Sequence, residues 1–425
     1  MQSLKATNRL HWRNFRLLWI GDGISTLGDQ FALIAFPWLV LQLTNDGFAL
    51  GLIIALINAA RALFTLIGGV LVDRFSPRPV MFASNIVRMT VFVLLAILVL
   101  TSQIQLWMVF ILGLIFGSAD ALYYPAQTAI LPQILAPERL ALGNTLVQGL
   151  AEFSLLVGPV LAGGVIALVG GGTPAPGAEV SPGMTGIGVA FGIDALSFLV
   201  PLVTLCFIHT RPPEESETSS SMLKSIKTGV VYIWSQPTTR LLFILAMIVN
   251  LFFAGPLWIG VPILANVNLV EKAAAYGIVV SAFGAGSLLG MVLAGVLFPP
   301  RPALYWRVLF GLVIVLGIGL ILMPATASTL IVSLAAALMG LAYGYMTIAT
   351  VTRLQKQVPE ELLGRVMGLL MFASMIGSPL SSVLAGALVD VSLSGLFVIA
   401  GALMIGASIA LSLVPSVRRL TLSSI

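Results

Sequence analysis

The 425 residues of the chain are 59% hydrophobic and only 9% charged, with a mean hydropathy of +1.07. Soluble domains carry about 25% charged residues, so these values exclude a water-soluble globular protein. The apolar runs do not alternate as barrel strands do, and the single cysteine, Cys206, excludes an intrachain disulfide.

Apolar runs long enough to cross a membrane follow one another along the whole chain. A spanning helix needs roughly 20 predominantly apolar residues. Twelve such runs, separated by charged or turn-forming residues, predict an all-α polytopic membrane protein with twelve transmembrane helices. In chain order they are Leu17–Leu43, Leu50–Val72, Val80–Thr101, Leu106–Leu131, Ala141–Val169, Met184–Ile208, Leu241–Val267, Ala274–Phe298, Leu304–Met323, Leu330–Thr352, Val366–Val389 and Leu393–Val414.

Lysine and arginine are distributed unequally between the two sides of these spans. Eighteen of the 21 lie in the two tails and in the loops of the same side, whereas Lys272 alone lies on the other side. Basic loops remain in the cytoplasm. We therefore expect a multi-pass protein of a bacterial-type plasma membrane, with both termini and the loop Thr210–Pro237 cytoplasmic. Topology thus explains the net charge of +5, and we expect no nucleic-acid partner.

Two sequence echoes indicate an internal repeat. Segment 131–140 is similar to segment 354–363, with the shared prolines 222 residues apart at Pro137 and Pro359. A Gly-Val-Leu followed by Pro-Arg-Pro occurs at 69–79 and again at 295–302. We therefore predict two six-helix bundles, residues 1–209 and 240–425, related by an axis along the membrane normal.

Residues 210–239 form the predicted cytoplasmic linker between the bundles. Its start is rich in proline, serine and glutamate, a composition typical of disorder. Its end, Met222–Trp234, has the pattern of a short amphipathic helix that lies on the membrane surface.

Charged residues inside the spans are concentrated in the first half of the chain. A charge at the middle of a membrane helix costs roughly 2.5–3.5 kcal/mol, so each one suggests a function. The five acids outnumber the two arginines, and crowded carboxylates in a low dielectric favour protonation of at least one of them. These residues are Asp22, Asp29, Arg61, Arg88, Asp120, Glu152 and Asp194.

Asp29 is the preferred proton-binding residue. It lies near the middle of the first span, and Arg61 lies near the middle of the second, so we expect these two to form an ion pair. Asp22 precedes Asp29 by seven residues, which places both on nearly the same helix face. Asp120 and Glu152 are next in order. The alternative is that these charges form structural pairs that fix helix packing.

The loop after the second span carries a resemblance to a known family. Its sequence, Gly69-Val-Leu-Val-Asp-Arg-Phe-Ser-Pro-Arg78, is similar to the G-x-L-a-D-r-x-G-r-k signature of the major facilitator superfamily, with departures at Ser76 and Pro77. Further segments are similar to the branch that includes the enterobactin exporter and macrolide efflux proteins. They are Ser25–Asp29, Tyr124–Pro132, Gly158–Gly163 and Asp194–Phe198.

The resemblance implies a secondary transporter that works by alternating access, commonly a proton-coupled antiporter. It implies that Asp73, with Arg74 and Arg78, belongs to a conformational latch. The alternative is a set of solvated loop charges. Gly158, Pro159 and Gly163 resemble the helix-five motif of antiporters and predict a kink there, the alternative being a packing kink without a coupling role.

The family's fold also implies which buried charges face the substrate cavity and which residues line it. It puts the first, fourth, seventh and tenth helices around a central cavity, which favours Asp120 and disfavours Asp194 and Arg88. The second half is expected to contribute apolar and aromatic lining. The candidates are Asn250, Phe253, Trp258, Tyr343, Tyr345 and Met346.

No motif predicts enzymatic, metal or nucleotide chemistry. His11 and His209 lack partners at ligand spacing, and the sequence has no glycine-lysine loop for ATP. We therefore expect a monomeric, proton-gradient-driven efflux protein for amphipathic small molecules of the drug or siderophore class, without cofactor. The alternatives are a lipid or metabolite transporter, an uncoupled facilitator, and a receptor or scaffold that has lost transport.

Overall fold

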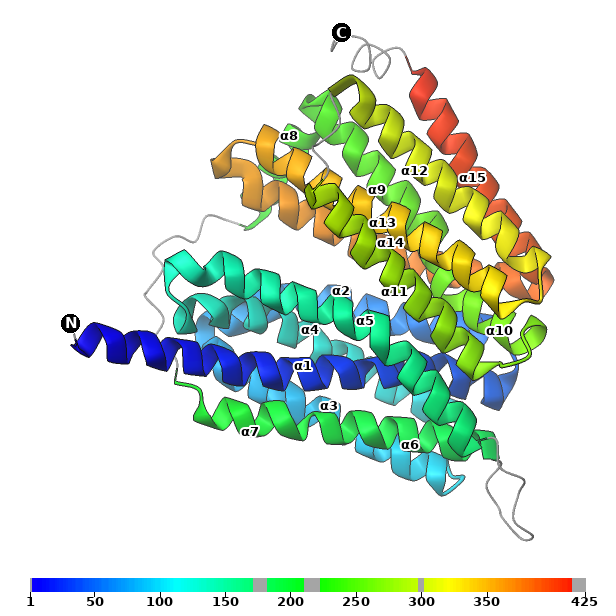
Figure 1. Ribbon diagram of the computed structural model, residues 1–425, viewed down its shortest axis with the longest axis horizontal. Coiled ribbons are helices and arrows are strands. Elements are labelled where there is room, and N and C mark those ends of the chain that lie inside the picture. Colours follow the sequence, from blue (N-terminus) through cyan, green and yellow to red (C-terminus); the bar gives the residue numbers. More distant parts are fainter. Residues whose placement is uncertain (1, 171–181, 210–221, 297–301, 415–425) are drawn as a thin grey trace. The chain divides into compact units, whose positions relative to one another are not determined.

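A computed structural model describes residues 2–170, 182–209, 222–296 and 302–414 (Figure 1), and every regular element within these ranges is a helix. The helices before the linker are α1 (Gln2–Thr44), α2 (Gly47–Phe75), α3 (Pro77–Leu100), α4 (Leu106–Ile134), η1 (Pro137–Arg139), α5 (Leu140–Gly170), α6 (Pro182–Ser197) and α7 (Leu199–Phe207). The later ones are α8 (Met222–Ser235), α9 (Pro237–Gly255), η2 (Pro256–Gly260), α10 (Val261–Asn268), α11 (Ala273–Val296), α12 (Pro302–Leu322), η3 (Met323–Ala325), α13 (Thr329–Gln357), α14 (Glu360–Val391) and α15 (Leu393–Leu413).

The predicted twelve-helix fold is confirmed. Among the described residues, eleven helical segments are long and apolar enough to cross a membrane. The remaining predicted span, Val366–Val389, which is the eleventh in chain order, lies within α14. Apolar segments of that helix, Leu362–Met371 and Gly377–Val391, flank a short stretch in which several side chains are outside the described part.

Two predicted spans are interrupted by proline. The sixth consists of α6 and α7, which meet at Phe198, because Pro201 has no N–H to donate to the carbonyl of Ser197. The seventh consists of α9, the π-helical turn η2 and α10. The N–H of Val261 bonds the carbonyl of Pro256, five residues back, as expected where a proline disrupts the regular ladder.

The predicted amphipathic helix of the linker is present as α8. It packs against α9 and α14, and the Tyr232 hydroxyl donates a hydrogen bond to the carbonyl of Gln357 at 3.3 Å. Val231 and Trp234 are exposed. Its position on a membrane surface stays a prediction, and the linker's start, residues 210–221, lies outside the described residues.

The chain divides into two compact units. The first comprises Met1–Asp46, Leu56–Glu215 and Glu271–Ser281. The second comprises Gly47–Ala55, Ser216–Val270 and Ala282–Ile425. The first turns of α2 therefore belong to the second unit, and the first turns of α11 belong to the first.

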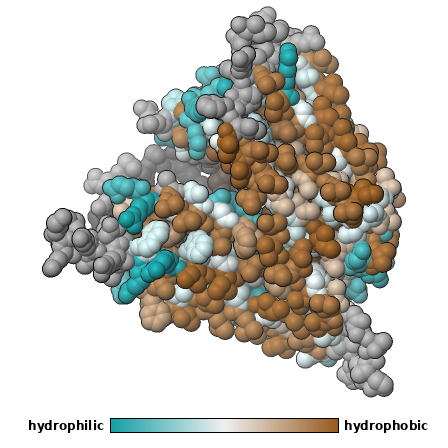
Figure 2. Space-filling model, viewed as in Figure 1, coloured by the Kyte–Doolittle hydropathy of each residue, from teal (hydrophilic) through white to brown (hydrophobic). Residues whose placement is uncertain are grey.

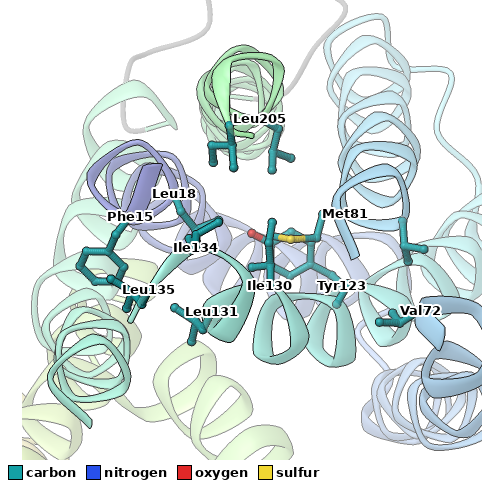
Figure 3. Packing of buried hydrophobic residues seen from close by; sticks show 13 residues of the cluster. Phe15, Leu18, Val72, Met81, Tyr123, Ile130, Leu131, Ile134, Leu135 and Leu205 are labelled. Atoms are coloured by element: carbon teal, nitrogen blue, oxygen red, sulfur yellow. The ribbon is translucent and has the colours of Figure 1, made fainter. Parts of the chain in front are cut away.

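Within the first unit, an apolar cluster joins α1, α3, α4 and α7 (Figure 3). Phe15 and Leu18 of α1, Met81 of α3, Ile130 of α4 and Leu205 of α7 are each at most 2% exposed. Lipid is as apolar as these side chains, so close packing rather than water exclusion holds them together. The face of the molecule seen in Figure 2 is accordingly mostly hydrophobic, with hydrophilic residues gathered mainly toward its edges.

Candidate functional site: a buried charge centre

Arg88 of α3 lies at the centre of a charge network in the first unit. Its side chain is 2% exposed, and its Nη2 donates hydrogen bonds to both carboxylate oxygens of Asp29, at 2.6 and 2.8 Å. The same nitrogen lies 3.4 Å from Asp120 Oδ1. The rings of Tyr123 and Phe198 lie 5.1 and 4.5 Å from the guanidinium carbon, so aromatic faces contribute to holding the cation.

Arg61 of α2 pairs with Asp120 of α4. Its Nε lies 2.8 Å from Asp120 Oδ2. A glycine in α4 permits the close helix approach behind this pair, because a Cβ at Gly117 would lie 2.6 Å from the carbonyl oxygen of Ile57. Ile57 is one turn before Arg61, and Gly117 is one turn before Asp120, so this contact brings the two charged side chains together.

The predicted ion pair between Asp29 and Arg61 is wrong. Asp29 pairs with Arg88, and Arg61 pairs with Asp120. The prediction assumed that helices adjacent in sequence are neighbours in space. In the structure α1 packs mainly on α5 and α6, whereas α2 contacts α4 at Gly117. Arg88, which the resemblance disfavoured, is the cation that holds Asp29 and also faces Asp120.

Asp22 differs from Asp29 and Asp120 in having neutral partners. Its carboxylate accepts hydrogen bonds from the Tyr123 hydroxyl and from Gln127 Nε2, the latter at 2.9 Å. The side chain is only 2% exposed. Among the described residues no cation forms an ion pair with it. Asp22 is therefore a buried carboxylate that hydrogen bonds stabilise and that has no ion-pair partner in the described part of the chain.

The three aspartates share a cavity with Arg88. The cavity has a volume of about 390 Å³, and its wall comes from α1, α3, α4 and α5. Their seven-residue spacing predicted one helix face, and both Asp22 and Asp29 line this cavity. Its polar neutral wall includes Thr26, Tyr124, Gln127, Asn144 and Gln148. A polar molecule or hydrated ion in this cavity would contact charged and neutral hydrogen-bonding groups together.

Glu152 and Asp194 lie outside that lining. Glu152 accepts a hydrogen bond from Gln148 Nε2 at 3.2 Å, and its second oxygen is buried without a partner. Asp194 is 0% exposed, accepts a long hydrogen bond from the Ser197 hydroxyl at 3.4 Å, and also has one unpartnered oxygen. Neither acid forms an ion pair with a described residue.

Sequence reasoning missed the two neutral residues that hold Asp22. Tyr123 and Gln127 follow Asp120 at three and seven residues on α4, so the three form one polar stripe on an otherwise apolar helix. Such a stripe is a usable signal, because a membrane helix presents polar groups only where a partner or a wet cavity meets them.

The aromatic residues predicted to bind substrate lie in the second unit. Asn250, Tyr343 and Met346 line a cavity of about 120 Å³ between α9, α13 and α14. Phe253 is 3% exposed and stacks on Tyr343, with ring centroids 5.9 Å apart. Trp258 and Tyr345, the other two candidates, are not among the residues that line this cavity.

The predicted latch is described only in part. The side chain of Asp73 lies outside the described part of the structure. Arg74 is exposed, with its guanidinium carbon 5.4 Å from the centroid of the Phe75 ring. Arg78 donates to the carbonyls of Leu205 and Cys206 at 2.8 and 3.0 Å. Arg78 thus satisfies the C-terminal carbonyls of α7, which is a structural role of its own.

Gly158, Pro159 and Gly163 lie within α5, which continues as one helix from Leu140 to Gly170. A Cβ at Gly163 would lie 2.6 Å from the carbonyl oxygen of Ala273 in α11. The N–H of Val160 donates to the hydroxyl of Ser281 at 3.1 Å. The motif therefore provides a close helix contact with the first turns of α11, all within the first unit.

Comparisons with known proteins agree with this architecture. Residues 18–382 match the Major Facilitator Superfamily. The enterobactin exporter EntS of Shigella boydii serotype 18 is 25% identical over 376 residues, which cover 88% of this chain and 85% of that protein. EntS of Escherichia coli O81 gives the same identity and coverage.

Two solved structures show the same fold at low sequence identity. The nucleoside transporter NupG superposes with a TM-score of 0.69 at 14% identity, over 96% of this chain and 98% of NupG. A bacterial homologue of the human lysosomal transporter Spinster, in an inward-facing and unoccupied conformation, gives 0.70 at 15%, over 98% and 97%. With the family match over residues 18–382, these findings establish that the chain belongs to the Major Facilitator Superfamily.

Proposed function

We propose that this protein is a proton-coupled exporter of amphipathic small molecules that works by alternating access. The observation that carries the proposal is the charge balance around Arg88. Asp29 and Asp120 are paired with arginines, whereas the hydrogen-bond partners of the buried Asp22 among the described residues are neutral. A carboxylate without an ion-pair partner is costly to keep in a membrane helix, so we expect it to have a function.

Asp22 is the acid best suited to carry the proton. The sequence favoured Asp29, but the two short contacts from Arg88 stabilise the ionised form of Asp29 and oppose its protonation. Asp22 gains or loses a proton without breaking an ion pair. It also lines the cavity, so a proton that enters there can reach it. Asp120 and Glu152 remain further candidates for coupling.

The two units support an amphipathic substrate. The first unit offers a cavity with charged and neutral hydrogen-bonding groups, and the second offers an aromatic cluster of Phe253, Phe283 and Tyr343 beside a smaller cavity. The likeness to the enterobactin exporter favours export over uptake and a substrate of the siderophore or drug class. Asp73, Arg74 and Arg78 remain the proposed latch.

The location and the energy source follow from the sequence. The excess of basic residues on one side favours a bacterial-type plasma membrane with both termini in the cytoplasm. One charge that crosses 100 mV is worth about 2.3 kcal/mol, so an ion gradient can supply the energy without ATP. We expect the working unit to be a monomer.

Transport by the purified protein in proteoliposomes tests the proposal. With the lumen more acidic than the bath, an antiporter exchanges outward-moving protons for substrate and concentrates substrate inside. Dyes, macrolides, siderophores and lipids are screened in turn. Accumulation that a protonophore abolishes supports the proposal. Equilibration without accumulation indicates an uncoupled facilitator, a lipid as the only substrate indicates the lipid alternative, and no flux of any compound favours a receptor or scaffold.

A further inference from the structure

Asp390, in the last turn of α14, caps the N-terminus of α2. Its Oδ1 accepts a hydrogen bond from the Gly47 N–H and its Oδ2 accepts one from the Phe48 N–H, both at 3.0 Å. The partners are 343 and 342 residues apart in the sequence, and all three residues belong to the second unit. This acid lies just beyond the predicted span Val366–Val389, and its partners were not predicted from the sequence.

The contact has a clear electrostatic basis. The first N–H groups of a helix have no partner within the helix, and the helix dipole makes that end positive. A carboxylate that accepts from two successive N–H groups satisfies both and places its negative charge at the positive end. Gly47 is needed for this approach, because a Cβ there would clash with the side chain of Val389.

A glycine crossing supports the same contact one turn further along each helix. A Cβ at Gly51 would lie 2.5 Å from the carbonyl oxygen of Ser382 and 2.9 Å from the Cα of Gly386. A Cβ at Gly386 would lie 2.9 Å from the carbonyl oxygen of Gly47. The backbones of α2 and α14 thus touch, and only small residues permit this.

The capped end of α2 is joined to the charge centre by a single helix. Gly47–Ala55 belongs to the second unit, and the same helix continues into the first unit, where it carries Arg61. Gly47 and Arg61 are 14 residues apart, which is about 21 Å along a helix axis. The helical backbone of α2 is thus continuous from its capped end to Arg61.

We propose that Asp390 is a lock that holds the N-terminus of α2 in this conformation, and that release of the lock is linked through α2 to the Arg61–Asp120 pair. Asp390 and Phe48 are exposed, so water can take over both hydrogen bonds when they break. A contact of this kind can form and break in each cycle at a small net cost. The link to ion pairing rests on the proposed transport function, whereas the lock itself does not.

Spin-label distance measurements test the lock directly. Cysteines replace Gln42 at the end of α1 and Ser394 in α15, both exposed, in a Cys206→Ser background that removes the single native thiol. In Asp390→Asn, an amide NH₂ replaces one acceptor oxygen and faces a backbone N–H. The population with a long distance between the two labels is expected to rise roughly tenfold relative to the population with a short one. The reason is that losing a hydrogen bond to a charged group changes an equilibrium constant by about that factor.

Two further variants separate a lock from a general structural effect. Gly51→Ala keeps the charge but spoils the glycine crossing, and it should shift the distances in the same direction. Glu138→Gln removes an exposed carboxylate of η1 and should leave them unchanged. Added salt should shift the wild-type distribution and have little effect on Asp390→Asn, because it screens a charge–dipole contact.

Identical distributions in wild type and Asp390→Asn would overturn the lock, as would an equal response of Glu138→Gln. The transport assay then separates this proposal from the proposed function. A distance shift in a protein that transports none of the screened compounds leaves the lock standing and removes the transport function. Proton-driven accumulation of substrate without any distance shift supports the transport function and overturns the lock. If the lock holds, Arg61→Gln should reduce the effect of Asp390→Asn on the rate of accumulation.

Discussion

Arg88 donates from one terminal nitrogen to both carboxylate oxygens of Asp29, and this pair distinguishes Asp29 from its neighbour Asp22. An acid held in this way is already neutralised in its ionised form. Its neighbour Asp22, two turns earlier on the same helix, has no such partner among the described residues. The two aspartates are therefore expected to respond differently to the same substitution.

Asp22→Asn should abolish proton-driven accumulation of substrate and leave downhill flux intact. Asparagine keeps an oxygen that can accept from the Tyr123 hydroxyl, but it cannot take up or release a proton. Stability should change little, because no ion pair is lost. Accumulation and downhill flux measured in the same proteoliposomes check this, with Glu138→Gln as the matched carboxylate control. Normal accumulation by Asp22→Asn would move the proton site to Asp120 or Glu152.

Asp29→Asn should act mainly on stability. Among the described residues it leaves the buried Arg88 with one anionic partner, Asp120 at 3.4 Å, and breaking a buried pair costs about 3–5 kcal/mol. Thermal unfolding in detergent should show a marked loss of stability. Asp29→Asn combined with Arg88→Met should recover much of it, because methionine can pack against the surrounding aromatic rings. A double variant no more stable than the single one would contradict this account.

Gly117→Ala should weaken the Arg61–Asp120 pair without touching a charged residue. The added methyl group would lie 2.6 Å from the Ile57 carbonyl oxygen, so α2 must move away from α4. Overpacking of this kind costs about 1–3 kcal/mol. Gly192→Ala in α6 is the control, since nothing lies within 4 Å of its Cβ, and it should be neutral or slightly stabilising. Equal unfolding temperatures for the two variants would argue against the helix contact.

A cysteine at Ser219 should resist labelling by an impermeant thiol reagent added outside intact cells. The reason is the concentration of basic residues in the linker and tails, from which we propose that this loop is cytoplasmic. Labelling after the membrane is made permeable confirms that the cysteine is reactive. Efficient labelling from outside would reverse the proposed orientation of the whole chain.

The sequence predicted the helices well because the length of an apolar run is a direct physical requirement of the bilayer. It also predicted that Asp22 and Asp29 lie on nearly the same helix face, and in the structure both line one cavity. The partner of Asp29 was missed, because depth and face do not say which helix lies opposite. The breaks at Phe198 and at Pro256 were missed as well, although Pro201 and Pro256 were visible.

The contact between α5 and α11 differs in kind from the one that Asp390 makes. At Gly163 and Gly277 the two backbones are in direct contact, and the hydrogen bond between the Val160 N–H and the Ser281 hydroxyl links the same two helices. Surfaces without interdigitated side chains resist sliding less than ridges packed into grooves. A small shift of the first turns of α11 along α5 therefore requires the exchange of the Val160–Ser281 hydrogen bond but no change of side-chain rotamer at the two glycines.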